Sequence, residues 1–341
     1  MSDKKKVVVY GASGYTGRLV CEYLREFNVP FIAAGRDKAR IAEALETVPG
    51  IGTVDHEIVE VEHAVGPLAE LFDGASVVCN MVGPFATYGA EVVEACLAAG
   101  CHYLDTTGEI AAQLCLEQPG LDTLDILVFW KGAPTVASTR TILVNAALAK
   151  AYYLEQNSYA EWPADGGLYT VTVPGQHETG LALPWGGTSH PVWFNRDPRV
   201  ANVKVLGGVF NRPLMLGVPQ IVAAALAQIA DLPEADKHRV LAEQAAAVMN
   251  QMPPREYTRI NTSLDSVHAS GPLGRAHCII HGNCNYKQTG LLQAFAAYSL
   301  LQQPPRRAGF ASGCQAFGHR ELLGVLRSFG LVMEPVLTRS S

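Results

Sequence analysis

The first third of the chain alternates short apolar runs with amphipathic segments. Residues 7–10 form a mostly β-branched run that ends at a glycine, a pattern typical of a buried central strand. The segment 14–27 then places apolar side chains at helical spacing, and residues 29–34 form a second apolar run. A strand, a helix and a second strand within about 30 residues predict a βαβ unit.

The same alternation continues to residue 130 and predicts an α/β fold, a Rossmann-type doubly wound parallel sheet. Gly100 follows an apolar helical segment and suits a left-handed C-cap. Further strands are expected at 56–61, 75–80, 101–105 and 125–130, and further helices at 39–48, 65–72 and 89–99.

A glycine-punctuated turn joins the first strand to the first helix. Ser13 stands where the usual dinucleotide-binding pattern has its second glycine, so the strand and helix around the turn carry the interpretation. Glycines allow the backbone to approach a pyrophosphate, whose charge faces the amides of a helix N-terminus. A purely structural turn is the alternative. The predicted cofactor-binding residues here are Gly11, Ser13, Gly14, Tyr15, Thr16 and Gly17.

The end of the second strand bears on the choice of cofactor. Arg36 follows Gly35 there, and a guanidinium can pair with a ribose 2′-phosphate through charge-assisted hydrogen bonds. The sequence therefore favours NADP over NAD. Two alternatives stay open: Arg36 lies in a solvated turn, or Asp37 reaches the ribose hydroxyl of NAD.

Ligands of open α/β sheets bind at the carboxyl ends of the strands. Asn80, Val82 and Gly83 end the fourth predicted strand and are expected near the ribose or the nicotinamide. The fifth strand runs into Thr107, Gly108 and Glu109, which place a hydroxyl and a carboxylate beside the same crevice.

The middle of the chain has a different character and predicts a second, α+β substrate domain. Ser138 or Thr139 can cap a helix that runs to about residue 153. We expect strands at 168–173 and 203–205, helices at 217–230 and 234–250, and a hairpin formed by 257–269 and 275–283. Apolar helices at 291–301 and 321–326 are expected to return to the first lobe. The predicted domains are a discontinuous Rossmann domain, 1–135 and 286–341, and a substrate domain, 136–285.

Composition and net charge favour some classes of protein over others. A chain of 341 residues that is 48% hydrophobic and 17% charged, with a net charge of −6, fits a compact soluble enzyme and not a nucleic-acid-binding protein. The apolar stretch 214–230 is interrupted by Pro219 and falls short of the ~20 residues that span a bilayer, so we expect a buried helix or a lipophilic substrate wall there and no transmembrane segment.

Cysteine usage and the N-terminus indicate a cytoplasmic protein. Too few apolar residues precede Gly11 for a secretory signal. The eight cysteines lack paired close spacings, which favours reduced thiols. His277, His281 and Cys284 form the one candidate metal cluster, but they lie in a predicted strand without a second close pair of ligands, so no metal is expected.

Three motifs carry a resemblance to a known family: the turn at 11–17, the segment 82–89, and the segment 102–109. Together they resemble the saccharopine dehydrogenase-like oxidoreductases, a group that includes the trans-acting enoyl reductases. The likeness covers about residues 6–115 and returns at 285–290.

The resemblance implies site residues. The turn at 11–17 would hold the pyrophosphate and Arg36 would face the adenosine ribose. Val82, Gly83 and Pro84 would lie along the nicotinamide, and the segment 107–109 would border the same pocket. The segment 132–139 departs from the Gly-Phe-Asp and Pro-Ser-Asp pattern of relatives, so the substrate does not transfer across the resemblance.

A nicotinamide cofactor makes hydride transfer the expected chemistry, and a proton must come from elsewhere. None of the 12 tyrosines has a lysine four positions later, which argues against the short-chain dehydrogenase solution. Lys131 and His177 are possible proton donors or polarising groups, because they lie near predicted edges of the crevice. Packing of the tyrosines and capping by Glu109 are the structural alternatives. The candidate catalytic residues are Tyr88, Tyr103, Glu109 and His190.

These observations predict an NADPH-dependent oxidoreductase that reduces a conjugated C=C bond, of the enoyl or enone type, in a largely apolar small molecule. C–N chemistry, as imine reduction or amino-acid dehydrogenation, is one alternative. A protein that senses NADP without turnover is another. Assembly is left open, a homodimer included.

Overall fold

The computed structural model describes residues 7–105, 109–163, 167–184, 189–249 and 251–340. The chain divides into two compact units. The first comprises residues 1–108 and 286–326, and the second comprises residues 109–285 and 327–341. The predicted contacts Thr107 and Gly108 lie outside the described residues.

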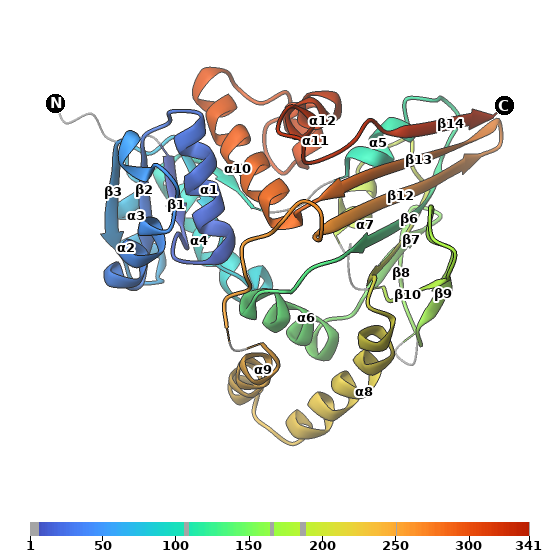
Figure 1. Ribbon diagram of the computed structural model, residues 1–341, viewed down its shortest axis with the longest axis horizontal. Coiled ribbons are helices and arrows are strands. Elements are labelled where there is room, and N and C mark those ends of the chain that lie inside the picture. Colours follow the sequence, from blue (N-terminus) through green and yellow to red (C-terminus); the bar gives the residue numbers. More distant parts are fainter. Residues whose placement is uncertain (1–6, 106–108, 164–166, 185–188, 250, 341) are drawn as a thin grey trace. The chain divides into compact units, whose positions relative to one another are not determined.

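The first unit is built on a five-stranded sheet in the order β3-β2-β1-β4-β5, with every neighbouring pair parallel (Figure 1). The predicted Rossmann-type sheet is therefore present. Its strands are β1 (Val7–Tyr10), β2 (Phe31–Gly35), β3 (His56–Glu60), β4 (Val77–Asn80) and β5 (His102–Leu104). Its connecting elements are α1 (Tyr15–Glu26), α2 (Lys38–Glu46), η1 (Ile51–Thr53), α3 (Val65–Phe72) and α4 (Phe85–Ala99).

The core of this unit explains why its strands could be predicted from the apolar runs. All four residues of β1 and of β4 are buried, as expected for central strands covered on both faces. Tyr10 and Val78 pack on one face against Phe72 of α3 and Val92 of α4. Gly100 takes the left-handed conformation after α4, with φ 69°, as predicted.

A returning segment completes the first unit with α10 (Asn285–Gln302), α11 (Gly313–Phe317) and α12 (His319–Ser328). Helix α10 packs closely on α1: a Cβ added at Gly290 would lie 2.7 Å from the Leu19 Cβ. Close packing of these two helices therefore requires glycine at position 290.

The second unit is built on a mixed seven-stranded sheet, in the order β14-β13-β12-β6-β11-β7-β8, with a separate pair β9 and β10. The β6 and β11 pair is parallel, whereas the other pairs are antiparallel. The strands are β6 (Thr123–Trp130), β7 (Tyr152–Glu155), β8 (Ser158–Glu161), β9 (Tyr169–Val171), β10 (Gly180–Ala182), β11 (Asn202–Val209), β12 (Thr262–Gly271), β13 (Gly274–Asn283) and β14 (Val336–Ser340).

Helices cover this sheet and form a small cluster of their own. They are α5 (Ile110–Cys115), α6 (Val136–Leu148), α7 (Ser189–Phe194), α8 (Arg212–Ile229) and α9 (Glu234–Val248). Phe129 and Leu264 pack on one sheet face with Val173 and Ala182. Leu143 of α6, Ile229 of α8 and Leu241 of α9 meet in the helical cluster.

The domain boundaries differ from the prediction. Strand β6, expected as the sixth strand of the parallel sheet, pairs instead with β12 and β11 of the second unit. A return to the first sheet needs a crossover of a dozen or more residues, usually a helix. Helix α5 has only six residues and packs on β12 and β13. The segment 327–340, assigned to the Rossmann domain, supplies β14 to the second sheet.

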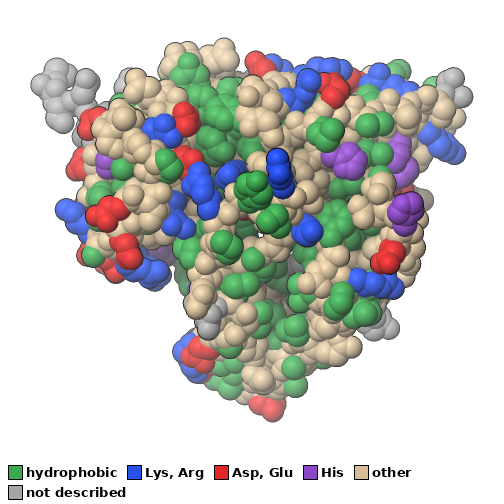
Figure 2. Space-filling model, viewed as in Figure 1, with side chains coloured by type: hydrophobic (Ala, Val, Ile, Leu, Met, Phe, Trp, Pro, Cys, Tyr) green, Lys and Arg blue, Asp and Glu red, His purple; other side chains and the backbone are tan. Residues whose placement is uncertain are grey.

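Two further expectations for the second unit were wrong in detail. Thr135, not Ser138 or Thr139, caps α6 by accepting a 3.0 Å hydrogen bond from the Ser138 amide. The segment of helix α8 was expected to be a buried helix or a lipophilic substrate wall. The helix is largely exposed, so the first alternative is wrong, and Figure 2 shows hydrophobic side chains over this region. Its large exposed side chains are Leu214, Leu216, Ile221 and Leu226.

Helix α8 also has the length and composition of a membrane span. It has 18 residues, is predominantly apolar and is largely exposed. Core helices of other proteins have the same length and composition, so these two properties do not by themselves indicate a membrane span. It is the single candidate among the described residues.

Candidate functional site

The turn between β1 and α1 is shaped by contacts that require glycine. A Cβ at Gly17 would lie 2.2 Å from the Gly11 carbonyl oxygen and 2.8 Å from the Ala12 Cα. Gly11 has φ +91°, and a Cβ there would lie 2.9 Å from a Val82 side-chain carbon. The turn therefore has no room for side chains at these two positions, and its backbone is bare where the predicted pyrophosphate site lies.

Backbone hydrogen bonds hold this turn against the sheet. The amides of Gly11 and Ala12 donate to the Ala34 carbonyl of β2, at 2.8 and 3.2 Å. The Gly14 amide donates to the Gly11 carbonyl at 3.0 Å. Gly14 is the N-cap of α1 and has no side chain to accept from the first-turn amides. A helix start that no side chain caps is compatible with phosphate binding.

Tyr15 and Thr16 begin α1. Tyr15 is buried and packs edge-on against Tyr286 of the returning helix, with the Arg18 guanidinium 5.5 Å from its ring centroid. Thr16 and Ser13 are partly exposed on the turn. Tyr15 therefore packs against the returning helix, and the cofactor contacts of Ser13, Tyr15 and Thr16 stay predictions.

Arg36 is exposed directly after β2, and the structure favours it over Asp37 as the ribose contact. Asp37 is the N-cap of α2 and accepts a 3.0 Å hydrogen bond from the Arg40 amide. The Lys38 amide next to it donates to Glu60 at 2.9 Å. Because Asp37 is committed to its helix, the guanidinium of Arg36 is the group at this strand end that suits a 2′-phosphate.

Asn80 fixes the loop after β4. Its side chain is fully buried, accepts a 3.0 Å hydrogen bond from the Val82 amide and donates one of 3.1 Å to the Tyr103 hydroxyl. Gly83 and Pro84 follow, joined by a cis peptide bond, and Pro84 is the N-cap of α4. Asn80 therefore positions the backbone of the segment predicted to lie along the nicotinamide.

Tyr103 is a positioning residue in this arrangement. Burial raises its pKa, and the nearby Asp105 carboxyl raises it further. Burial also raises the pKa of Asp105, whose backbone carbonyl accepts a hydrogen bond from Gln293 of α10. A phenol whose pKa is raised is a weaker acid near neutral pH, so the structure offers no support for Tyr103 as proton donor.

Tyr88 lies in a different cluster of the first unit. Its ring meets the His63 ring edge-on, with centroids 5.3 Å apart. His63 in turn hydrogen-bonds the Tyr10 hydroxyl at 2.8 Å and lies 3.7 Å from the Glu91 carboxylate. The packing alternative for Tyr88 is therefore the better supported one.

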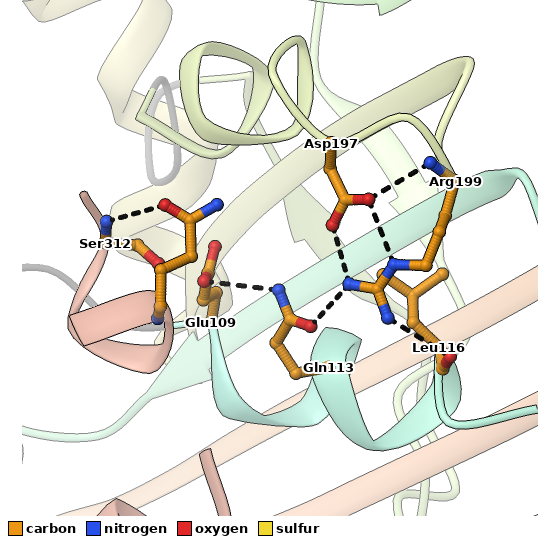
Figure 3. Close-up of polar contacts among 7 residues, drawn as sticks. Glu109, Gln113, Leu116, Asp197, Arg199 and Ser312 are labelled. Carbon is orange, nitrogen blue, oxygen red and sulfur yellow. Dashed lines mark hydrogen bonds and ion pairs between the residues drawn. The ribbon is translucent and has the colours of Figure 1, made fainter. Parts of the chain in front are cut away.

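Glu109 begins a chain of polar contacts in the second unit (Figure 3). It is buried, and its carboxylate accepts a 3.3 Å hydrogen bond from Gln113, one turn along α5. The Gln113 carbonyl accepts from Arg199 at 2.9 Å. Two nitrogens of Arg199 also bind the two carboxylate oxygens of Asp197, at 3.0 and 2.6 Å. Glu109 is the N-cap residue of α5, but its side chain caps no amide.

Arg199 holds this network together. Its hydrogen bonds with Asp197 raise the pKa of the Arg199 guanidinium. Another guanidinium nitrogen donates a 3.3 Å hydrogen bond to the Leu116 carbonyl. Sequence reasoning missed the network, because only the i, i+4 spacing of Glu109 and Gln113 is visible without the fold. Nothing in the sequence links α5 to a residue 86 positions away.

His190 is buried on α7 near two aromatic rings of the same helix. The ring of Trp193 lies 5.5 Å away and that of Phe194 lies 6.5 Å away, centroid to centroid. The candidate metal residues do not converge. His277 hydrogen-bonds Ser266 at 2.9 Å and stacks on His268. Among the described residues, no group of three His, Cys, Asp or Glu side chains could hold a metal ion.

Comparison with protein families accounts for both parts of the chain. Residues 7–162 match the family described as "Saccharopine dehydrogenase NADP binding domain". Residues 106–341 match the family described as "Family of unknown function (DUF5938)". The resemblance to saccharopine dehydrogenase-like oxidoreductases is confirmed, and so is the expectation that the glycine turn belongs to an NADP-binding domain.

Individual relatives match about a third of the chain. A "Lipid droplet localized protein" of Caenorhabditis elegans is 37% identical over 113 residues, 31% of this chain and 26% of the relative. A "Trans-acting enoyl reductase" of Mycobacterium ulcerans is 32% identical over 107 residues, with the same coverage. A human "Saccharopine dehydrogenase-like oxidoreductase" is 33% identical over 117 residues, 30% of this chain and 27% of the relative.

The matched region thus spans about a quarter of the length of these relatives. The family that matches from residue 106 onward, in contrast, covers most of the chain. The chain therefore belongs to the family of unknown function DUF5938, and it opens with an NADP-binding domain of the saccharopine dehydrogenase type.

Proposed function

We propose that the protein is an NADPH-dependent reductase that acts on a conjugated C=C bond of a largely apolar small molecule. The observation that carries the cofactor part is the turn at 11–17, where Gly17 and Gly11 leave the backbone bare and no side chain caps the start of α1. The NADP-binding family of residues 7–162 supports the same conclusion.

The residues of the first unit would bind and orient this cofactor. The α1 amides would hold the pyrophosphate, and Arg36 would pair with the 2′-phosphate. Asn80, by fixing the Val82 amide, would keep the loop after β4 in one conformation. When bound, NADPH supplies a hydride, and the protein must provide orientation and exclude water.

Two observations favour C=C reduction over C–N chemistry. One is that some relatives of the first unit bear the name trans-acting enoyl reductase. The other is that Arg199, an arginine of the second unit, is held by Asp197, Gln113 and the Leu116 carbonyl, so it does not offer a guanidinium to a dicarboxylate substrate.

The test is consumption of NADPH with a panel of substrates. Purified protein is mixed with NADPH and, in parallel, with enones, enoyl thioesters and cyclic imines, and NADPH absorbance is followed. We expect oxidation with an enone or an enoyl thioester and the saturated product by mass spectrometry. Oxidation with imines alone would replace the proposal by C–N chemistry. Tight NADPH binding without turnover of any class would support an NADP sensor instead.

A further inference from the structure

Two cysteines of the first unit meet at the C-terminal end of helix α4. Cys96 belongs to the last turn of the helix, and Cys101 follows the glycine that ends it. The Cys101 amide donates a 3.1 Å hydrogen bond to the Cys96 carbonyl, and the Gly100 amide donates one of 3.3 Å to the Leu97 carbonyl. With Gly100 in the left-handed conformation, these two bonds form a Schellman motif.

This motif brings the two thiols together. The side chain after the glycine commonly packs on the side chain five residues earlier, and here both side chains are cysteines. The Cys101 thiol donates a 3.7 Å hydrogen bond to the Cys96 carbonyl, and the two thiols hydrogen-bond each other. The main-chain bond between the same two residues keeps their Cα atoms close, as a disulfide requires.

The two thiols differ in their access to solvent. Cys96 is 2% exposed and belongs to the core cluster that contains Val92 and Ala95, whereas Cys101 packs on that cluster and is partly exposed. The hydrogen bond from Cys96 lowers the pKa of the Cys101 thiol, and the same bond together with burial raises the pKa of the Cys96 thiol. A partly exposed thiol of lowered pKa beside a second thiol is typical of an oxidisable cysteine with its resolving partner.

A second pair of thiols, in the second unit, serves as a comparison. Cys115 of α5 and Cys278 of β13 also hydrogen-bond each other, and this bond lowers the pKa of the Cys115 thiol. The Cys115 thiol donates to the Val267 carbonyl at 3.6 Å. Both cysteines of this pair are fully buried. The two pairs therefore share a contact between thiols and differ in whether solvent reaches one of them.

The pair of the first unit lies away from the predicted cofactor site. Cys101 directly precedes β5, and the amide of the next residue, His102, donates a 2.9 Å hydrogen bond to the Ser76 carbonyl just before β4. The cysteine is therefore at the amino ends of these parallel strands, whereas ligands of open α/β sheets bind at the carboxyl ends. What the two thiols do is for this reason separate from the proposed reductase function.

We propose that Cys96 and Cys101 are a modification site at which hydrogen peroxide forms a reversible disulfide. The Cys101 sulfur attacks one peroxide oxygen, the O–O bond breaks, and the other oxygen leaves as water with the thiol proton. The Cys96 sulfur then attacks the Cys101 sulfenic acid, which forms the S–S bond and releases a second water. The two thiols lose two electrons to one peroxide molecule. A dithiol reductant restores both thiols by exchange.

The contact between the thiols determines which product forms. A sulfenic acid without a thiol in reach is open to further oxidation to the sulfinic acid, which is generally irreversible. Cys96 is in contact with Cys101 before any oxidation, and the helix end that places it there is held by its own backbone hydrogen bonds. We therefore expect the disulfide to form before the sulfinic acid.

The test is thiol mapping of the full-length native protein during treatment with hydrogen peroxide. Free thiols are alkylated at intervals, and digestion after Glu94 and Glu109 releases a peptide whose only cysteines are Cys96 and Cys101. We expect this peptide to lose two hydrogen atoms and to resist alkylation, with a rate at least roughly tenfold above that of Cys115 oxidation. Dithiothreitol added before alkylation should restore both thiols.

Three variants separate the roles of the thiols. Cys101→Ser should leave Cys96 reduced at the same peroxide dose. Cys96→Ala should stop the reaction at the Cys101 sulfenic acid, which dimedone labels far more strongly than in wild type. Cys115→Ala is the matched control, because it removes a thiol of the buried pair, and it should form the disulfide at the wild-type rate.

The proposal is overturned if Cys96 and Cys101 stay reduced in the native protein or are oxidised no faster than Cys115. A disulfide that joins Cys101 of two molecules, in place of the one with Cys96, would also overturn it. These outcomes are read from wild type, so they hold even if a variant fails to fold. They also do not depend on whether the protein consumes NADPH with any substrate.

Discussion

The two units hold their candidate functional groups by different means. In the first unit, the nucleotide turn consists of backbone amides, bare glycines and one exposed arginine, and side chains such as Asn80 only hold the loops in place. In the second unit, the candidate group is a buried side chain, Glu109 within the Arg199 network. A binding site made of backbone amides needs room for the ligand to approach the backbone. A site made of side chains depends on how deeply those side chains are buried and on the charges around them. Substitutions should therefore damage the two units in different ways.

The most damaging substitution expected is Gly17→Ala, which places a methyl group where a backbone carbonyl lies 2.2 Å away. Overpacking of this kind costs about 3 kcal/mol or more when backbone has to move. NADPH affinity, measured by calorimetry, should fall more than about a hundredfold.

Gly66→Ala is the matched control, because nothing lies within 4 Å of a Cβ there. It should leave NADPH affinity unchanged and slightly stabilise α3. Wild-type affinity in Gly17→Ala would show that the turn yields easily, and the backbone account of the first unit would be wrong.

Arg199→Met tests the second unit. It leaves the buried Asp197 carboxylate without its bidentate partner, while the partial exposure of Arg199 reduces the cost. The free energy of unfolding in urea should fall by about 2 kcal/mol. Arg239→Met, which breaks exposed pairs on α9, should change it by less than about 0.5 kcal/mol. Equal effects of the two substitutions would contradict a special role for the buried network.

Arg36→Ala tests whether Arg36 determines the preference for NADPH over NADH. Loss of charge-assisted hydrogen bonds to the 2′-phosphate should weaken NADPH binding roughly tenfold while NADH binding stays the same. Arg40→Ala, at an exposed position on the neighbouring helix, should change neither. A parallel loss for both cofactors would mean that Arg36 contacts a part that they share.

Tyr103→Phe should have the smallest effect. It removes the hydrogen bond to Asn80 and should lower the free energy of unfolding by about 1 kcal/mol, with little change in kcat. Tyr159→Phe, on an exposed strand, should change stability by a few tenths of a kcal/mol. A large loss of kcat with normal stability would return Tyr103 to the catalytic candidates.

The parallel sheet of the first unit was predictable because its strands have a distinctive sequence pattern. Val7–Tyr10 and Val77–Asn80 are buried on both faces, so every position is apolar or small apart from the terminal residue, and glycines mark the turns. The hairpin of β12 and β13 was also visible, from the turn residues at 271–274.

Sheet membership and long-range contacts were not predictable in the same way. Strand β6 has the composition of a parallel core strand, and only its partners reveal that it belongs to the second sheet. The contact of Gln113 on α5 with Arg199 joins residues 86 positions apart, and no local sequence pattern reveals it.

The discontinuous first unit has a consequence for synthesis on the ribosome. Its sheet is complete by residue 105, yet α10 arrives only after the intervening residues 109–285. At about 5–20 residues per second, that interval is roughly 10–40 s. Until then the surface of α1 around Leu19, which α10 covers in the finished protein, is open to the surrounding water and to chaperones.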